Sequence, residues 1–241
     1  MSERQMVNDT MLIAGAIGIA PALFLMYYSL KNYTYPSVQR PFFDDRKLFL
    51  MLAIGMVVGV LMFSVQNMFD IAFVLFALLF AVIEELVKLV VLNIPRFQKK
   101  LDTTFYGYSF GLGIGSTMAF GAVFATMVAF NSAGTALTVF DAILLGLIAI
   151  QFSLLNGATG ATIGIGVARG LPFGYFSQAT IVHLAFNLIM IGFFSLDPPL
   201  KYVAFAAATA VVAYYYYIIH FRTVPKFVAS ELKKFESRTK G

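Results

Sequence analysis

The chain of 241 residues is 60% hydrophobic and only 12% charged, and its mean hydropathy is +0.83. One soluble core cannot bury that much apolar surface, so the composition excludes an ordinary soluble domain and predicts a polytopic membrane protein. Cysteine is absent, which excludes disulfides, thiol nucleophiles and cysteine-ligated metals. The net charge of +5 fits basic residues beside anionic lipid headgroups at the cytosolic face, and we expect no nucleic-acid partner.

Seven apolar stretches of about 20 residues follow one another, each long enough to cross ~30 Å of hydrocarbon as a helix. They cover residues 11–30, 47–66, 71–94, 105–130, 138–167, 176–196 and 200–221. The sequence therefore predicts an all-α fold, with a seven-helix transmembrane domain over residues 1–221 and a basic amphipathic cytosolic tail over 222–241. The tail resembles a surface helix lying on anionic lipid, with apolar Phe227, Val228, Leu232 and Phe235 set against Lys233, Lys234 and Arg238.

Lysine and arginine in the loops indicate the orientation. With the N-terminus outside, every basic residue except Arg4, Lys201 and the intramembrane Lys88 falls on the cytosolic side. The positive-inside rule therefore predicts an N-terminus outside, a cytosolic C-terminus and a multi-pass protein of the cell membrane.

Two adjacent carboxylates and an ammonium interrupt the third apolar stretch, in the sequence Glu84-Glu85-Leu86-Val87-Lys88. Each charge at membrane depth costs at least ~2.5–3.5 kcal/mol on insertion scales, so such residues face protein or water and mark functional sites. The i, i+4 spacing predicts that Lys88 is the structural charge partner of Glu84. Glu85 then points about 100° away around the helix and is free for chemistry.

Glycines in the fourth and fifth stretches have the spacing of closely packed membrane helices. They recur at four-residue intervals, as Gly107, Gly111 and Gly115 and as Gly160 and Gly164. Small residues at this spacing let helix backbones approach closely. We expect the stripes to bring these two helices tightly against the third, which carries Glu84 and Glu85.

Further polar residues lie in the fifth and sixth stretches. His183 and Asn187 are one turn apart on one face of the sixth, and Asn156 lies within the fifth. At 1.5 Å per residue from the cytosolic ends, Glu84 and Glu85 lie roughly 14 Å deep, His183 about 11 Å, Asn187 about 17 Å and Asn156 roughly 16 Å. We therefore expect these five residues to converge on one layer of the membrane.

Such a layer has the groups needed to hydrolyse an amide. A buried glutamate can act as general base toward water, with a second carboxylate or an ammonium controlling its protonation, and histidine can orient the water. An asparagine amide is a suitable oxyanion donor. We predict catalytic roles for Glu84, Glu85, His183, Asn187 and Asn156. The alternative is that these residues have structural roles alone, as a Glu–Lys pair and a His–Asn pair.

Metal chemistry is the weaker interpretation. The HExxH motif is absent, and one histidine with two glutamates is a thin ligand set for catalytic zinc. We therefore expect no cofactor, with zinc as the alternative.

An ordered set of motifs resembles the PrsW family of intramembrane proteases along nearly the whole chain. The set comprises Ile19 to Leu25 followed by Tyr27-Tyr28, then Glu84-Glu85-Leu86-Val87-Lys88, Phe105-Tyr106-Gly107 with Gly111-Leu112-Gly113, and His183. The family is related to the CAAX prenyl endopeptidases, to which the His183-xxx-Asn187 pair is similar. This resemblance implies a membrane-embedded endopeptidase centred on Glu84 and Glu85, with His183 as a partner, acting on a membrane-embedded or membrane-anchored protein.

Two positions depart from that family pattern. Met118-Ala119 stands where the family has Glu-Asn, and Asn156 stands where it has histidine. The chain also resembles the seven-span anterior-pharynx-defective subunit of γ-secretase, a non-catalytic relative, in its Gly-xxx-Gly-xxx-Gly stripe, topology and length. Two functions therefore stay open: a PrsW-type endopeptidase that uses a buried glutamate to activate water, and a non-catalytic scaffold or assembly subunit with a membrane-protein partner.

Overall fold

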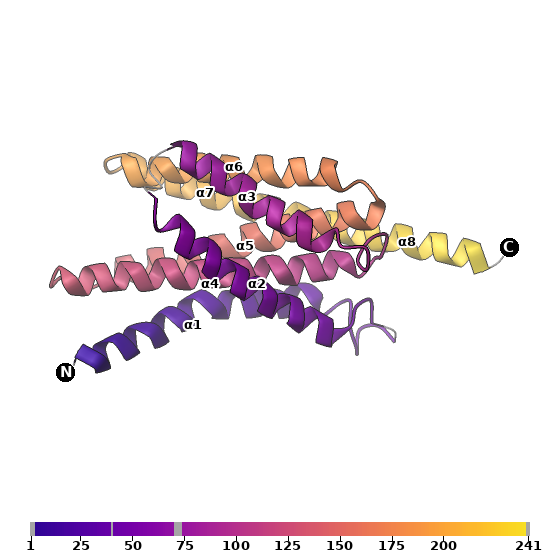
Figure 1. Ribbon diagram of the computed structural model, residues 1–241, viewed down its shortest axis with the longest axis horizontal. Helices are drawn as coiled ribbons and strands as arrows, with labels where there is room; N and C mark the ends of the chain where they lie inside the picture. Colours follow the sequence, from indigo (N-terminus) through magenta and orange to yellow (C-terminus); the bar gives the residue numbers. More distant parts are fainter. Residues whose placement is uncertain (1–2, 40, 70–73, 240–241) are drawn as a thin grey trace.

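The computed structural model describes residues 3–39, 41–69 and 74–239, which form an elongated bundle of long helices with no strand among them (Figure 1). The helices are α1 (Glu3–Leu30), α2 (Asp45–Gln66), α3 (Val74–Leu92), α4 (Thr103–Ser132), α5 (Val139–Arg169), α6 (Pro172–Ser195) and α7 (Leu200–Tyr217). A π-helical turn, η1 (Ile218–Thr223), joins α7 to α8 (Val224–Thr239). The protein is therefore all-helical, as its sequence predicts.

Six helical segments in the described chain are long and apolar enough to cross a membrane, judged by length and composition. They are Asn8–Leu30, Asp45–Gln66, Thr103–Ser132, Val139–Arg169, Pro172–Ser195 and Leu200–Lys234. Helix α3, with 19 residues, is not among them, and it carries Glu84, Glu85 and Lys88. Residues 71–73 of the predicted third span lie outside the described residues. These long apolar helices are those of an integral membrane protein.

Local sequence signals explain where several helices begin and end. The Asp44 side chain caps α2 by accepting hydrogen bonds from the backbone N–H groups of residues 46 and 47. Thr138 forms a capping box with Asp141 at the start of α5. Gly170 ends α5 in the left-handed conformation, with φ of 74°, and Pro172 opens α6.

Helices α4 and α5 form the central pair of the bundle. A Cβ atom added at Gly107 would overlap the carbonyl oxygen of Gly160, and one added at Gly111 would overlap that of Asn156. The glycine stripes therefore bring the two backbones together, because any side chain there would separate them. Helices α1 and α2 pack on α4, whereas α6 and α7 pack on α5.

Helix α3 lies mainly against α6 and makes smaller contacts to α5 and α4, so it does not pack along the glycine stripes as expected, although its Leu92 side chain meets Gly107. The glycine faces of α4 are already occupied, because Gly113 fits against the backbone of α2 on one side and Gly107 against that of α5 on the other. Helix α3 is therefore held by its polar residues and by α6.

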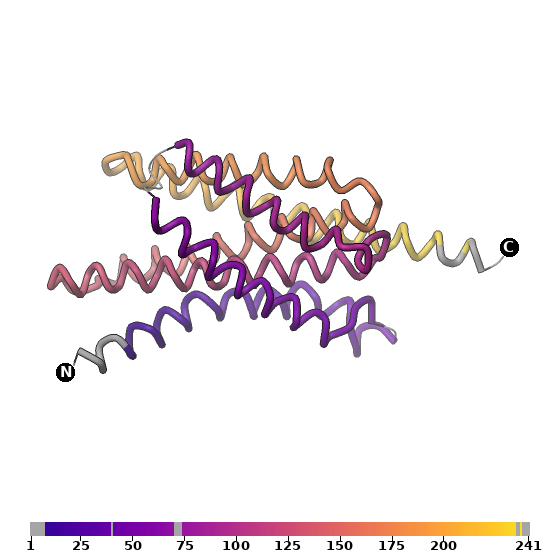
Figure 2. The backbone as a smooth tube through the Cα atoms, viewed as in Figure 1, coloured from indigo at the N-terminus to yellow at the C-terminus, as the bar shows by residue number. Residues whose placement is uncertain are grey.

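Helices α7, η1 and α8 form one continuous rod that extends beyond the rest of the bundle (Figure 2). The boundary predicted between residues 221 and 222 thus falls inside η1. The π turn adds a residue, so that Ile219 and Val224, five apart, stay on one face with Phe227 and Val228, and all four are buried in the main core. Phe227 and Val228 therefore face the bundle and not lipid as expected, whereas Leu232 is exposed; the Phe235 side chain lies outside the described residues.

Candidate functional site

A buried polar cluster joins three helices at the level of Glu85. Nδ1 of His183 on α6 lies 2.6 Å from Oε1 of Glu85 on α3, and Nζ of Lys88 donates to the same oxygen at 2.6 Å. Lys88 also donates to Oγ1 of Thr159 on α5 at 2.8 Å. Glu85 and Lys88 are fully buried, and His183 is 3% exposed. The cluster therefore fixes the positions of α3, α5 and α6 relative to one another.

The pairing within this cluster differs from the predicted one. Lys88 pairs with Glu85, at i, i+3, and not with Glu84. Ala81, Glu85, Lys88 and Leu92 are all fully buried and form the stripe of α3 that faces the interior. Because Glu84 lies at the margin of that stripe, it is displaced from the ammonium and turned toward α2.

Glu84 has a different environment from Glu85. Its Oε1 accepts a hydrogen bond from Nε2 of Gln66 at 2.5 Å, and its Oε2 lies 3.7 Å from Nε2 of His183. No hydrogen-bond partner of that Oε2, or of Oε2 of Glu85, occurs in the described part of the chain. His183 is thus held by Glu85 through one ring nitrogen and directs the other toward Glu84.

Glu84 and His183 line a mostly apolar cavity of about 180 Å³. Its walls are Phe63 and Gln66 of α2, Ala77 and Phe80 of α3, Met118, Ala122 and Thr126 of α4, Leu145, Ile148 and Phe152 of α5, and Phe186, Asn187, Met190, Ile191 and Phe194 of α6. Apolar pockets with a few convergent polar groups are the usual form of a ligand or active site.

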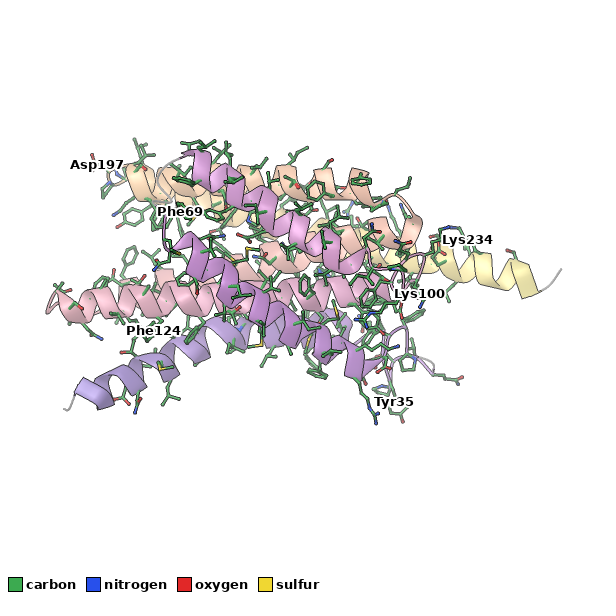
Figure 3. All side chains as sticks on the ribbon, viewed as in Figure 1. Tyr35, Phe69, Lys100, Phe124, Asp197 and Lys234 are labelled. Atoms are coloured by element: carbon green, nitrogen blue, oxygen red, sulfur yellow. The ribbon has the colours of Figure 1, made fainter. Side chains whose placement is uncertain are left out.

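The cavity lies in the half of the bundle where α2 ends and α3 begins. Figure 3 places Phe69 and Asp197 at that end, and Lys100 and Lys234 toward the opposite end. We call the end with Lys100 and Lys234 the basic end of the bundle. The polar cluster closes the inner end of the cavity, and the cavity extends from there away from the basic end.

The two asparagines have different surroundings. Asn187 lines the cavity, and its Nδ2 donates to the carbonyl oxygen of Ala77 at 2.9 Å, tying α6 to α3. Asn156 does not line it: it is fully buried, and its Nδ2 donates to the carbonyl oxygen of Phe152 in its own helix at 3.2 Å. The structure thus brings Glu84, Glu85, His183 and Asn187 together and leaves Asn156 outside, because membrane depth does not determine which way a residue faces.

Sequence reasoning missed Gln66 and Thr159. Both are buried, and each completes a hydrogen bond to a charged group of the site. Each is a polar residue within, or at the end of, an apolar stretch, and that position was the available sequence signal. For an uncharged residue this position is weak evidence of a functional site, because side chains such as those of serine and threonine often bond to their own helix backbone.

The cavity-facing groups do not fit a catalytic zinc ion. Glu85 is engaged by Lys88 and His183, so among the described residues only Glu84 and Nε2 of His183 face the cavity as strong metal ligands. Catalytic zinc normally takes three protein ligands. Within the described ranges, no group of three or more His, Cys, Asp and Glu side chains is arranged to hold a metal ion.

The remaining geometry suits a water molecule. A carboxylate oxygen and an imidazole nitrogen 3.7 Å apart can both hydrogen-bond one water placed beside them. Gln66 fixes the carboxylate, and Glu85 fixes the imidazole.

Comparisons with models of protein families, with curated proteins and with solved structures found no match to this chain.

Proposed function

We propose that the protein is an intramembrane endopeptidase of the PrsW type, in which Glu84 activates a water molecule to hydrolyse a peptide bond of a membrane-embedded or membrane-anchored protein. One observation carries the proposal. Glu84 and His183 face a single apolar cavity inside a bundle of membrane-type helices, with Oε2 of Glu84 at 3.7 Å from Nε2 of His183.

In the first step, Glu84 removes a proton from water while the water oxygen bonds to the substrate carbonyl carbon. The carbonyl oxygen becomes an oxyanion. Glu84 then returns the proton to the substrate nitrogen as the carbon–nitrogen bond breaks, giving a carboxyl and an amine product. Glu84 therefore ends as the carboxylate with which it began, and no oxidant or reductant is needed.

His183 and Asn187 are the proposed polar partners of this reaction. Nε2 of His183 faces Glu84 and is placed to hold the water. Asn187 uses one amide N–H on Ala77, which leaves the second as the candidate oxyanion donor. Both side chains line the cavity, where low polarity strengthens their interactions with developing charge.

Glu85, Lys88 and Thr159 are positioning residues in this scheme. Glu85 and Lys88 form an ion pair, and their mutual attraction offsets the cost of burying both charges. Thr159 accepts a second hydrogen bond from the ammonium. The same Glu85 oxygen fixes the imidazole of His183. Loss of any of the three would disturb the imidazole without removing a reacting group.

We further propose that α3 is a seventh span, with the N-terminus outside the cell membrane and the C-terminus in the cytosol. Helix α2 ends, and α4 begins, at opposite ends of the bundle, and α3 runs between these ends (Figure 1). The exposed face of α3 is apolar throughout, with Leu75, Leu79, Val82, Leu86 and Val90. Its charged residues point inward and its apolar residues outward, as a lipid-exposed helix requires.

A non-catalytic assembly subunit is the second candidate. The observation that favours it is the set of hydrogen bonds that joins Glu85, Lys88, Thr159 and His183, which accounts for a stable buried cluster without catalysis. In that case the Glu84 cavity would hold no reacting water, and the protein would purify with a membrane-protein partner.

The deciding experiment uses the purified full chain in liposomes with a panel of single-span substrate proteins. We expect cleavage by the wild type, loss of at least 100-fold with Glu84→Gln, and no change with Glu231→Gln, a matched control on the surface of α8. Melting curves establish that both variants fold. Absence of wild-type cleavage together with a stoichiometric membrane partner would favour the assembly subunit.

A further inference from the structure

A second hollow lies at the basic end of the bundle, away from the Glu84 cavity and sharing no residue with it. It has a volume of about 460 Å³ and is formed by the end of α5 and by α7, η1 and the start of α8. The lining includes Arg169, Arg222 and Lys226 together with Tyr214, Tyr217 and Thr223. We call it the basic hollow.

The basic hollow gathers positive charge with which no carboxylate of the described residues forms an ion pair. No acidic residue lines it, and none of the ion pairs found in the described residues involves Arg169, Arg222 or Lys226. The guanidinium of Arg169 donates to the Tyr175 hydroxyl at 2.5 Å, and that of Arg222 lies 5.6 Å from the Tyr217 ring. Such contacts hold the guanidinium groups in place while leaving their charge available.

The helix register directs these groups to one side. Tyr214, Ile218, Arg222 and Lys226 are spaced four residues apart along the rod of α7, η1 and α8, and all line the hollow. Arg169 approaches from the end of α5. Cations from two elements of the fold therefore surround one space, which suits a group with several anionic oxygens. Arginine binds phosphate through two parallel N–H groups, and lysine binds it as a point charge.

An apolar face of α7 leads away from the basic hollow. Val203, Ala207, Ala210 and Tyr214 are exposed along it at intervals of three or four residues. An amphiphile with its anionic group in the hollow can place its acyl chains along this face. Tyrosine and basic residues together are typical of the headgroup level of a membrane. The chemistry of hollow and face together matches a phospholipid better than a soluble anion.

We propose that the basic hollow is a binding site for the phosphate headgroup of one anionic phospholipid, whose acyl chains lie along α7. The lipid would be bound by Arg222 and Lys226 on the rod and by Arg169 on α5. The site is independent of the proposed peptidase activity, and it differs from general attraction of the tail to an anionic surface because it has a fixed stoichiometry and fixed residues.

The test uses the full chain in nanodiscs of phosphatidylcholine with a small fraction of phosphatidylglycerol, and native mass spectrometry counts the phosphatidylglycerol that remains bound. We expect one retained molecule per wild-type chain. The double variant Arg222→Gln/Lys226→Gln should bind about 30-fold more weakly, which corresponds to about 2 kcal/mol for two charges at the membrane surface. The control Lys233→Gln/Lys234→Gln removes the same charge from α8 outside the basic hollow and should retain the lipid.

Two further arms keep the outcome interpretable. Melting in pure phosphatidylcholine establishes that each variant folds, and the single variant Lys226→Gln, with a smaller loss of binding, replaces the double variant if that one does not fold. Adding glycerol phosphate to the wild type in pure phosphatidylcholine tests a soluble source of the same group. Equal lipid loss in the control variant, full retention in the hollow variants, or saturation of the basic hollow by glycerol phosphate would each overturn the proposal.

Discussion

Replacing Lys88 by methionine tests the buried ion pair at the centre of the candidate site. The ammonium is fully buried and donates to Glu85 at 2.6 Å and to Thr159 at 2.8 Å, so its removal leaves the Glu85 carboxylate with His183 as its remaining partner. Breaking a buried pair in this way costs about 3–5 kcal/mol, and we expect the lower part of that range because the imidazole still contacts the carboxylate. The double variant Lys88→Met/Glu85→Gln removes both charges and should recover most of the loss, to within about 1–2 kcal/mol of the wild type.

The assay is reversible unfolding of the full chain in mixed micelles, with the free energy of unfolding compared among variants. Glu84→Gln is the matched control, since Glu84 bonds to Gln66 and does not contact Lys88; it should cost about 1 kcal/mol or less. A Glu84→Gln variant as unstable as Lys88→Met would refute the assigned pairing. So would a double variant no more stable than the single one.

Three further expectations concern activity, packing and metal. His183→Ala should abolish turnover while leaving the fold intact, because Glu85 keeps its pair with Lys88. The control is His220→Ala, which should leave turnover unchanged because His220 contacts the rings of Tyr108 and Tyr216 outside the cavity. Activity assays and melting curves on the same preparations distinguish the two variants. Gly111→Ala should lower the free energy of unfolding by about 1–3 kcal/mol, because the new methyl group meets a carbonyl of α5. Gly146→Ala, whose methyl group would meet no atom within 4 Å, should be neutral or slightly stabilising. Equal effects of the two substitutions would contradict the packing of α4 on α5. Peptidase activity should survive chelators, and elemental analysis showing about one zinc per chain, with activity lost on chelation and restored by zinc, would contradict a carboxylate-activated water.

The sequence by itself determined the helical class and marked some of the residues that line the cavity as candidates. Runs of apolar residues long enough for a membrane predict the long helices, because backbone polar groups in hydrocarbon must be satisfied within each helix. Charges inside one such run marked Glu84 and Glu85 as functional candidates, because burying them is costly without a purpose. The stripe from Gly107 to Gly115 predicted a close helix contact, since only glycine leaves room for a neighbouring backbone, but the neighbour is α5 and not α3 as expected.

Only the tertiary structure decided which partner each of these residues has. The i, i+4 spacing predicted that Lys88 pairs with Glu84, but the rotation of α3 about its own axis, set by packing on α6, selected Glu85 at i, i+3. Depth placed Asn156 in the same layer as His183, yet the rotation of α5 leaves it outside the cavity, where its amide donates to a carbonyl of its own helix. Gln66 joins the site from a helix that does not pack along α3, and nothing in its local sequence encodes that contact. A helical sequence specifies which residues share a face, whereas the direction of that face depends on all the neighbouring helices together.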